Sequence, residues 1–254
     1  MSNQEFSQNL FRNILDLWIS PEIKRRRQAN TLPENFQLKG AVVFLSDRGN
    51  SPPSILLNQE AELTAELKLK NGIVKVKGDP VKPEEIESIV GLIPSAVLNN
   101  HQSVRNKSYV AIYQWKPNEW TISFDFRYNK SEAKEHLAAA KEFCQVAEYS
   151  HANGLKRSFF DNAFSSCELA TMAVLITLPQ GREKHDSHHA RLETLSEWCK
   201  LGNQPRFVFS TQNTLWSLRK SARYLSSKEY STQKPEDILN ELRTIIKLAE
   251  ESLS

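Results

Sequence analysis

The amino-acid sequence predicts an α+β protein in which a β-rich N-terminal domain precedes a domain built only of helices. Two observations lead to this fold class. Before residue 129, several segments alternate apolar and polar residues with the period of two that is typical of strands. From residue 131 onward, apolar residues recur every three or four positions, which is the period of a helix. We therefore divide the 254 residues into domains 1–129 and 130–254.

The N-terminal domain is predicted to hold an antiparallel sheet with flanking helices. An apolar stripe from Phe6 to Trp18 indicates a first helix, and Pro21 is expected to end it. Strands are then predicted at 41–45, 62–70, 73–77, 108–115 and 120–127. Asn71-Gly72 favours a type I′ turn and so predicts a hairpin between the second and third strands. A short helix is expected at 83–90.

The C-terminal domain is predicted to hold five antiparallel helices with short connections. Their apolar stripes run over 133–147, 155–178, 187–199, 210–225 and 235–253. Gly154 and Gly202 follow the first and third helices, where a C-terminal cap often needs a left-handed residue. Ser210 is the expected N-cap of the fourth helix, and Pro235 lies in the first turn of the fifth. Helices of this kind form a bundle.

Composition excludes some classes of protein and leaves others open. No apolar run reaches the length of a membrane span and the N-terminus has no secretory signal, so we expect a cytoplasmic protein with no membrane association. Residues 1–129 carry 16 Lys and Arg against 14 Asp and Glu, and residues 130–254 carry 17 against 16. Charge alone therefore does not imply nucleic acid. Three cysteines without a CxxC pair predict reduced thiols.

The order of features in the C-terminal domain resembles the HEPN family of small helical domains, which is associated with RNA cleavage and with defence or toxin systems. The matching segments are AKEHLAAAKEFCQVAEYSHANG, FFDNAFSSCELATMAVLI, KHDSHHARLETL, LWSLRKSARYL and EDILNELRTIIKLAEESL. The fourth of them contains Leu215, Arg219, Ala222 and Tyr224 and is similar to the fourth helix of the family. The resemblance covers about half of the chain and implies a five-helix HEPN-like bundle.

HEPN ribonucleases carry an Arg followed four to six residues later by a His. The His exchanges protons with the ribose 2′-OH and the leaving oxygen while the Arg stabilises phosphate charge, so neither a metal nor a cofactor is required. Arg182 precedes His188 with five residues between them, and His189 with six. The resemblance thus implies Arg182 and His188 as catalytic residues, with His189 as the fallback; a solvated, capping or structural role is the alternative. Tyr224 follows Arg219 at the distance of a His, a departure from the catalytic pattern.

Two further groups of polar residues are candidates for binding. The basic run Lys24, Arg25, Arg26 and Arg27 can contact RNA phosphates, as can Arg219, although a solvated surface is the alternative. On the predicted second helix, Asp161, Asn162 and Glu168 stand where a polar residue of the family can face the active site, and helix capping is the other explanation for Asp161 and Asn162.

A metal site is not expected from the sequence. His185, Asp186, His188 and His189 lie within five positions, but no further Cys or His pair completes a set of four zinc ligands. His101, in a polar segment, is expected to be an ordinary loop residue.

Two functions fit these residues. The first is a HEPN-like, RNA-directed protein of a bacterial-type defence or toxin system, acting as a metal-independent endoribonuclease. The resemblance implies a homodimer through the helical domain, because two copies then bring their Arg and His residues to one cleft. The second is a non-catalytic interaction module in which the helical bundle docks a protein partner and the β-rich domain binds a ligand or a protein.

Overall fold

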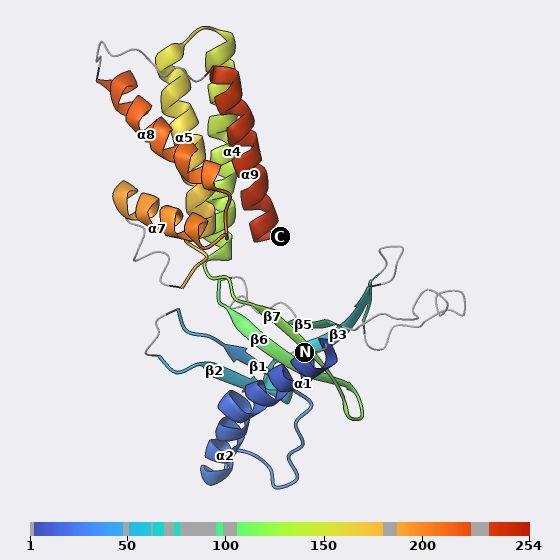
Figure 1. Cartoon of the computed structure of the whole chain (residues 1–254). Helices are drawn as coiled ribbons and strands as arrows, with labels where there is room; N and C mark the ends of the chain where they lie inside the picture. The colour runs from blue at the N-terminus through green and yellow to red at the C-terminus, as the bar shows by residue number, and fades with distance from the viewer. Residues whose placement is uncertain are drawn as a thin grey trace, which may run out of the picture. The chain divides into compact units, whose positions relative to one another are not determined.

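The chain folds into two compact units, residues 1–126 and 127–254. The computed structural model describes residues 3–47, 51–61, 63–68, 74–76, 95–98, 106–179, 187–224 and 234–254 (Figure 1). The first unit contains the strands together with helices, and the second contains helices. This confirms the predicted α+β fold class with a helical C-terminal region. In the described part of the chain, no helix combines the length and the apolar character needed to cross a membrane.

The strands of the first unit form two antiparallel sheets among the described residues. They are β1 Gly40–Phe44, β2 Ser54–Leu57, β3 Leu63–Lys68, β4 Val74–Val76, β5 Ser95–Leu98, β6 Tyr109–Lys116 and β7 Glu119–Asp125. The larger sheet has the order β2-β1-β6-β7 and the smaller has β4-β3-β5. The sequence predicted a single sheet and missed β2 and β5, because their sequences, SILL and SAVL, are short and do not alternate apolar with polar residues.

The predicted hairpin is confirmed in its strands only. β3 and β4 are antiparallel neighbours, with Leu67 opposite Lys75. Its turn at Asn71-Gly72 and the helix expected at 83–90 lie outside the described residues.

One continuous helical run packs on the larger sheet. It comprises α1 Asn3–Ile14, a π-helical turn η1 Leu15–Ile19, and α2 Ser20–Gln28. The expectation that Pro21 ends the first helix is wrong. Pro21 instead lies in the first turn of α2, where its missing N–H is tolerated, and the wider π turn directly precedes it. Ile14 and Ile19 are buried against Val43, Val110 and other apolar residues of β1, β2 and β6.

The second unit is a bundle with five helices among its described residues (Figure 1). They are α4 Lys130–Ala152, α5 Lys156–Leu175, α7 His188–Lys200, α8 Arg206–Arg223 and α9 Pro235–Leu253. Gly154 and Gly202 have positive φ angles of 69° and 80°, as their predicted places after α4 and α7 require. Ser210 is not the N-cap of α8: the helix begins four residues earlier, after Pro205, and the Ser210 hydroxyl donates to the Phe207 carbonyl.

Two residues join the start of the helical unit to the end of α5. The Tyr128 N–H donates to the Thr177 carbonyl over 2.9 Å, and the Asn129 side-chain amide donates to the Ile176 carbonyl over 3.0 Å. These bonds explain why the compact units divide at 126/127, whereas the change of period in the sequence falls at 129/130.

Candidate functional site

A carboxylate, an imidazole and a guanidinium meet where α7 packs on α5. His188 is the first residue of α7, and Ser187 caps this helix by accepting a hydrogen bond from the Ala190 N–H. The His188 Nδ1 atom contacts the Glu168 Oε1 atom of α5. Arg191 lies one turn after His188, and its Nη2 donates to the same oxygen over 2.8 Å. We call Glu168, His188 and Arg191 the His188 cluster.

The geometry of the His188 cluster fixes the orientation of the imidazole. The Nδ1 atom is engaged by Glu168, and Arg191 Nη2 also lies 2.8 Å from it, so Nε2 is the ring nitrogen left to exchange protons with a substrate. The Glu168 and Arg191 side chains are only 14% and 12% exposed, whereas the His188 side chain is 44% exposed. A held but accessible imidazole of this kind can act as a general acid or base.

A second group of charges lies on α5 two turns before Glu168. The Asp161 carboxylate accepts hydrogen bonds from two arginines of α8, from Arg219 Nε over 3.1 Å and from Arg223 Nε over 2.7 Å. Burial works to raise the pKa of Asp161, but the hydrogen bonds from Arg223 and Arg219 outweigh it and hold this pKa below its usual range. We call Asp161, Arg219 and Arg223 the arginine fork. Asp161 therefore pairs with α8 and does not cap α5, which begins five residues earlier.

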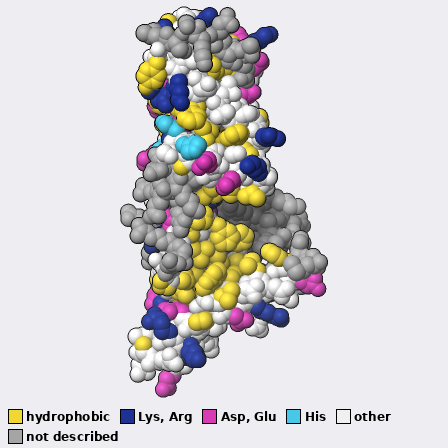
Figure 2. Space-filling view, turned by 60° about the vertical axis from the view of Figure 1, so that its left-hand side comes forward, with side chains coloured by type: hydrophobic (Ala, Val, Ile, Leu, Met, Phe, Trp, Pro, Cys, Tyr) yellow, Lys and Arg dark blue, Asp and Glu magenta, His cyan; other side chains and the backbone are white. Residues whose placement is uncertain are grey.

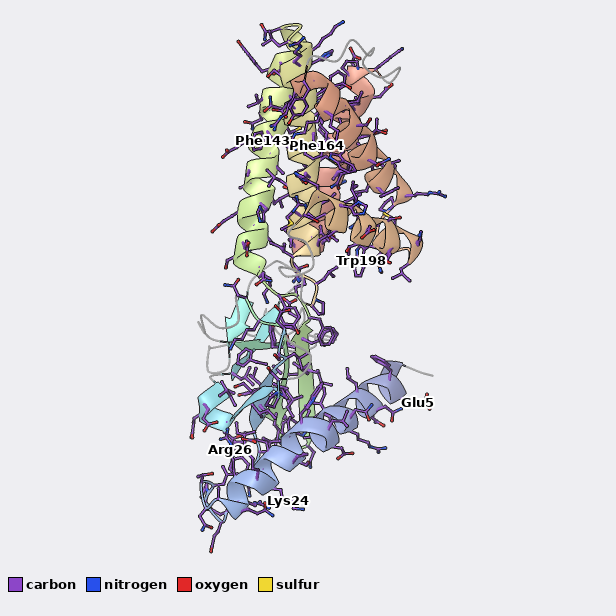
Figure 3. The ribbon with its side chains drawn as sticks, turned by 90° about the vertical axis from the view of Figure 1, so that its left-hand side faces the viewer. Glu5, Lys24, Arg26, Phe143, Phe164 and Trp198 are labelled. Atoms are coloured by element: carbon purple, nitrogen blue, oxygen red, sulfur yellow. The ribbon has the colours of Figure 1, made fainter. Side chains whose placement is uncertain are left out.

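Phe164 connects the two groups. It lies between Asp161 and Glu168 in the sequence of α5, and Figure 3 labels its ring inside the bundle. The Arg219 guanidinium carbon is 4.5 Å from the centre of this ring, and the His188 ring meets it edge-on with the centroids 5.7 Å apart. The imidazole and the guanidinium are thus held beside one rigid aromatic ring. Figure 2 shows His side chains near Lys or Arg side chains on one face of the helical unit.

The structure describes two of the three predicted catalytic residues and gives them different surroundings. His188 belongs to the cluster described above. His189 points elsewhere, with its side chain 75% exposed and its Nε2 atom 3.2 Å from Glu193 Oε1 on the same helix. Arg182 lies outside the described residues, as do His185, Asp186 and His101.

The basic run on α2 divides into paired and exposed residues. Arg26 donates to Glu22, to Glu60 and to the Ile55 carbonyl, and its side chain is only 15% exposed. In Figure 3 it lies on the side of α2 that faces the strands. Arg25 donates to Glu22 through Nε and Nη2, and this hydrogen bond is the main reason why the pKa of Glu22 falls to about 2.

Lys24 and Arg27 are exposed, as Arg25 is, and they also border a shallow groove of about 480 Å³ together with Phe36 and Leu38. Arg26 therefore has a structural role in the first unit, while Lys24 and Arg27 keep their charged groups exposed beside the groove.

Metal and thiol chemistry receive no support from the described residues. No group of three or more His, Cys, Asp or Glu side chains among them is arranged to hold a metal ion. Cys144, Cys167 and Cys199 are free, and burial raises the pKa of each thiol. Thiols of this kind are poor nucleophiles and act as packing groups.

Sequence reasoning did not single out Arg191 or Arg223. Arg191 follows His188 by three residues, and Arg223 follows Arg219 by four, so each shares a helical face with a residue that was singled out. This helical spacing was the signal in the sequence that could have identified Arg191 and Arg223. No protein-family model matches the chain, and no curated protein matches it.

Proposed function

We propose that this chain is a HEPN-like, RNA-directed protein of a defence or toxin system, and that it acts as a metal-independent endoribonuclease. The observation that carries the proposal is the His188 imidazole, half-exposed at the start of α7 and oriented by the Glu168 carboxylate. In this account His188 is the acid–base residue and Glu168 its positioning residue. Arg182, just before α7 in the sequence, supplies the charge for the scissile phosphate, as the resemblance implies.

The proposed reaction is an internal transesterification. The ribose 2′-oxygen bonds to phosphorus, and the bond from phosphorus to the 5′-oxygen of the next nucleotide breaks. The 2′-OH proton passes to the Nε2 atom of a neutral imidazole, and a protonated imidazole gives a proton to the leaving 5′-oxygen. The products are a 2′,3′-cyclic phosphate and a 5′-hydroxyl, and the steps use no metal.

A homodimer fits this chemistry. The reaction needs a base and an acid at one phosphate, and each chain offers one His188 cluster. Two copies joined through the helical domain supply both groups to one cleft. In this account the protein works in the cytoplasm, where its RNA substrate is found.

A second candidate function is the non-catalytic interaction module. The observation that favours it is an uncovered apolar stripe on α4, where Phe143, Val146 and Tyr149 are 37%, 45% and 65% exposed. Exposed apolar stripes mark surfaces that bind other proteins. In this alternative the stripe docks a protein partner, and the His188 cluster is only a structural ion pair.

Incubating purified protein with RNA in the presence of EDTA separates the two functions. The substrates should include a structured and a single-stranded RNA, each labelled at one end. Endonuclease action predicts internal cleavage that EDTA does not prevent and that His188→Ala abolishes. His136→Ala is the matched control, because His136 is a histidine of α4 that pairs with Glu132 outside the cluster. Intact RNA in every reaction would favour the interaction module.

A further inference from the structure

The arginine fork has more positive charge than its carboxylate balances. Asp161 supplies one negative charge, while Arg219 and Arg223 supply two positive charges. Arg223 is forked on Asp161, with its Nη2 atom 3.1 Å from Oδ2 in addition to the Nε contact. A net positive charge therefore remains at this place on the surface, held by two side chains whose directions are set.

The fork also keeps hydrogen-bond donors available. Arg219 donates to Asp161 through Nε, and among the described residues its two terminal nitrogens have no acceptor. Stacking on the Phe164 ring holds this guanidinium in place. Arg223 is 46% exposed and is accessible to a ligand from solvent. Guanidinium groups present several N–H donors in a planar array that suits phosphate oxygens.

The position of the fork suggests which phosphate it binds. Because the Arg219 guanidinium and the His188 ring lie 4.5 and 5.7 Å from the centre of the same ring, they are no more than about 10 Å apart. They are nevertheless separate groups, each with its own carboxylate on α5. A phosphate bound by the fork is thus a neighbour of the phosphate that His188 acts on.

We infer that Arg219 and Arg223 form a subsite for a backbone phosphate of RNA next to the scissile one. That the neighbouring phosphate is the scissile one rests on the proposed function. Binding of a backbone phosphate by the two arginines does not depend on cleavage. It makes the substrate a chain that is engaged at two phosphates or more. A single nucleotide or a chain-terminal phosphate alone does not satisfy both groups.

The test measures binding with a probe that cannot be cleaved. A 2′-O-methyl RNA 12-mer is titrated with the whole protein at several salt concentrations, and the logarithm of the binding constant is plotted against that of salt. For single strands the slope changes by about 0.7 for each phosphate contact. We expect Arg223→Ala to reduce the slope by that amount, and Arg219→Ala/Arg223→Ala to weaken binding further. Lys220→Ala is the matched control, since it removes one charge from the same helix where Lys220 covers Trp216.

The outcomes separate this inference from the proposed function. The subsite is overturned if the salt dependence of binding is the same in Arg223→Ala as in wild type. It is also overturned if Lys220→Ala reduces that slope as much as Arg223→Ala does. Both outcomes hold even if the protein cleaves RNA. A reduced slope in Arg223→Ala supports the subsite even if no RNA is cleaved, and then only the proposed function fails. Probes with and without a 5′-phosphate complete the test: equal affinity supports a backbone phosphate, and binding that requires the terminal phosphate overturns it. Arg223→Ala changes an exposed side chain, so the fold is retained.

Discussion

Glu168 holds the ring of His188 by its Nδ1 atom, across the contact between α5 and α7. The pair joins residues 20 positions apart in the sequence, and Arg191 donates to the same carboxylate oxygen. The Arg191 Nη2 atom also lies 2.8 Å from Nδ1, so both partners hold the ring by the same nitrogen and leave Nε2 toward solvent. The relationship gives His188 what a general acid–base residue needs, which is a fixed direction and an accessible nitrogen.

Glu168→Gln should lower cleavage without unfolding the helical unit. The amide oxygen still accepts from Arg191, but the charge that supports a His188 imidazolium is lost. We expect the rate to fall by less than in His188→Ala, because the variant weakens the contact that orients the imidazole but keeps the ring. Initial rates on one end-labelled RNA, beside a thermal unfolding curve, check this. An unchanged rate would mean that Glu168 has no part in positioning the imidazole.

His189→Ala should keep cleavage close to wild type. The ring is exposed and pairs only with Glu193 one turn later on α7, among the described residues, so its loss changes neither the core nor the His188 cluster. Initial rates of His188→Ala and His189→Ala on one end-labelled RNA make the comparison. Loss of activity in His189→Ala with full activity in His188→Ala would reverse the assignment.

The first unit should lose stability in acid through Glu22. Hydrogen bonding and charge from Arg25 and Arg26 lower its pKa from 4.5 to about 2 in the folded state. Because the folded pKa lies below the unfolded one, the contribution to stability is present above about pH 4.5 and is lost as the pH falls toward 2. We expect the contribution of Glu22 to the free energy of unfolding to be about 1 to 3 kcal/mol once solvent screening has reduced it. Urea unfolding at pH 5 and at pH 3 measures this contribution as a difference between two free energies of unfolding. That difference should be smaller in Glu22→Gln than in wild type.

Arg26→Ala and Arg27→Ala should differ in their effects although the residues are neighbours. Removing the Arg26 side chain leaves Glu22, Glu60 and the Ile55 carbonyl without a shared donor, which should cost about 1 to 3 kcal/mol. Arg27 is exposed, so its replacement should change stability by less than about 0.5 kcal/mol. Any RNA binding by α2 should be weakened by Arg27→Ala. Equal unfolding free energies for the two variants would contradict the structural role of Arg26.

The helical stripes could be predicted because burial along a helix repeats with a fixed period. Ala133, Leu137, Ala140, Cys144 and Ala147 were predicted as one face of a helix, and all five are buried on α4. Helix ends were harder. Pro21 has the residue type of a helix stop, yet it lies in the first turn of α2 after a π turn. Ser210 has the residue type of an N-cap, yet α8 already begins at Arg206.

The candidate site could be predicted only in part, because its residues come from different helices. His188 was found by its spacing from Arg182, which is a property of the sequence. Its partner Glu168 is on another helix, and only the docking of α7 on α5 brings the two side chains together. Asp161 shows the same limit, since local spacing suggested a cap while the packing of α8 gives it two arginines.

Cleavage of one end-labelled RNA by wild type and by His188→Ala, both in EDTA, tests the central claim most directly. The account predicts that wild type produces internal fragments ending in 2′,3′-cyclic phosphate. His188→Ala should be slower by about 10²- to 10⁴-fold, the usual contribution of a general acid–base residue, at an unchanged unfolding temperature. Cleavage that stops in EDTA, or a folded His188→Ala protein that cleaves at the wild-type rate, would contradict it.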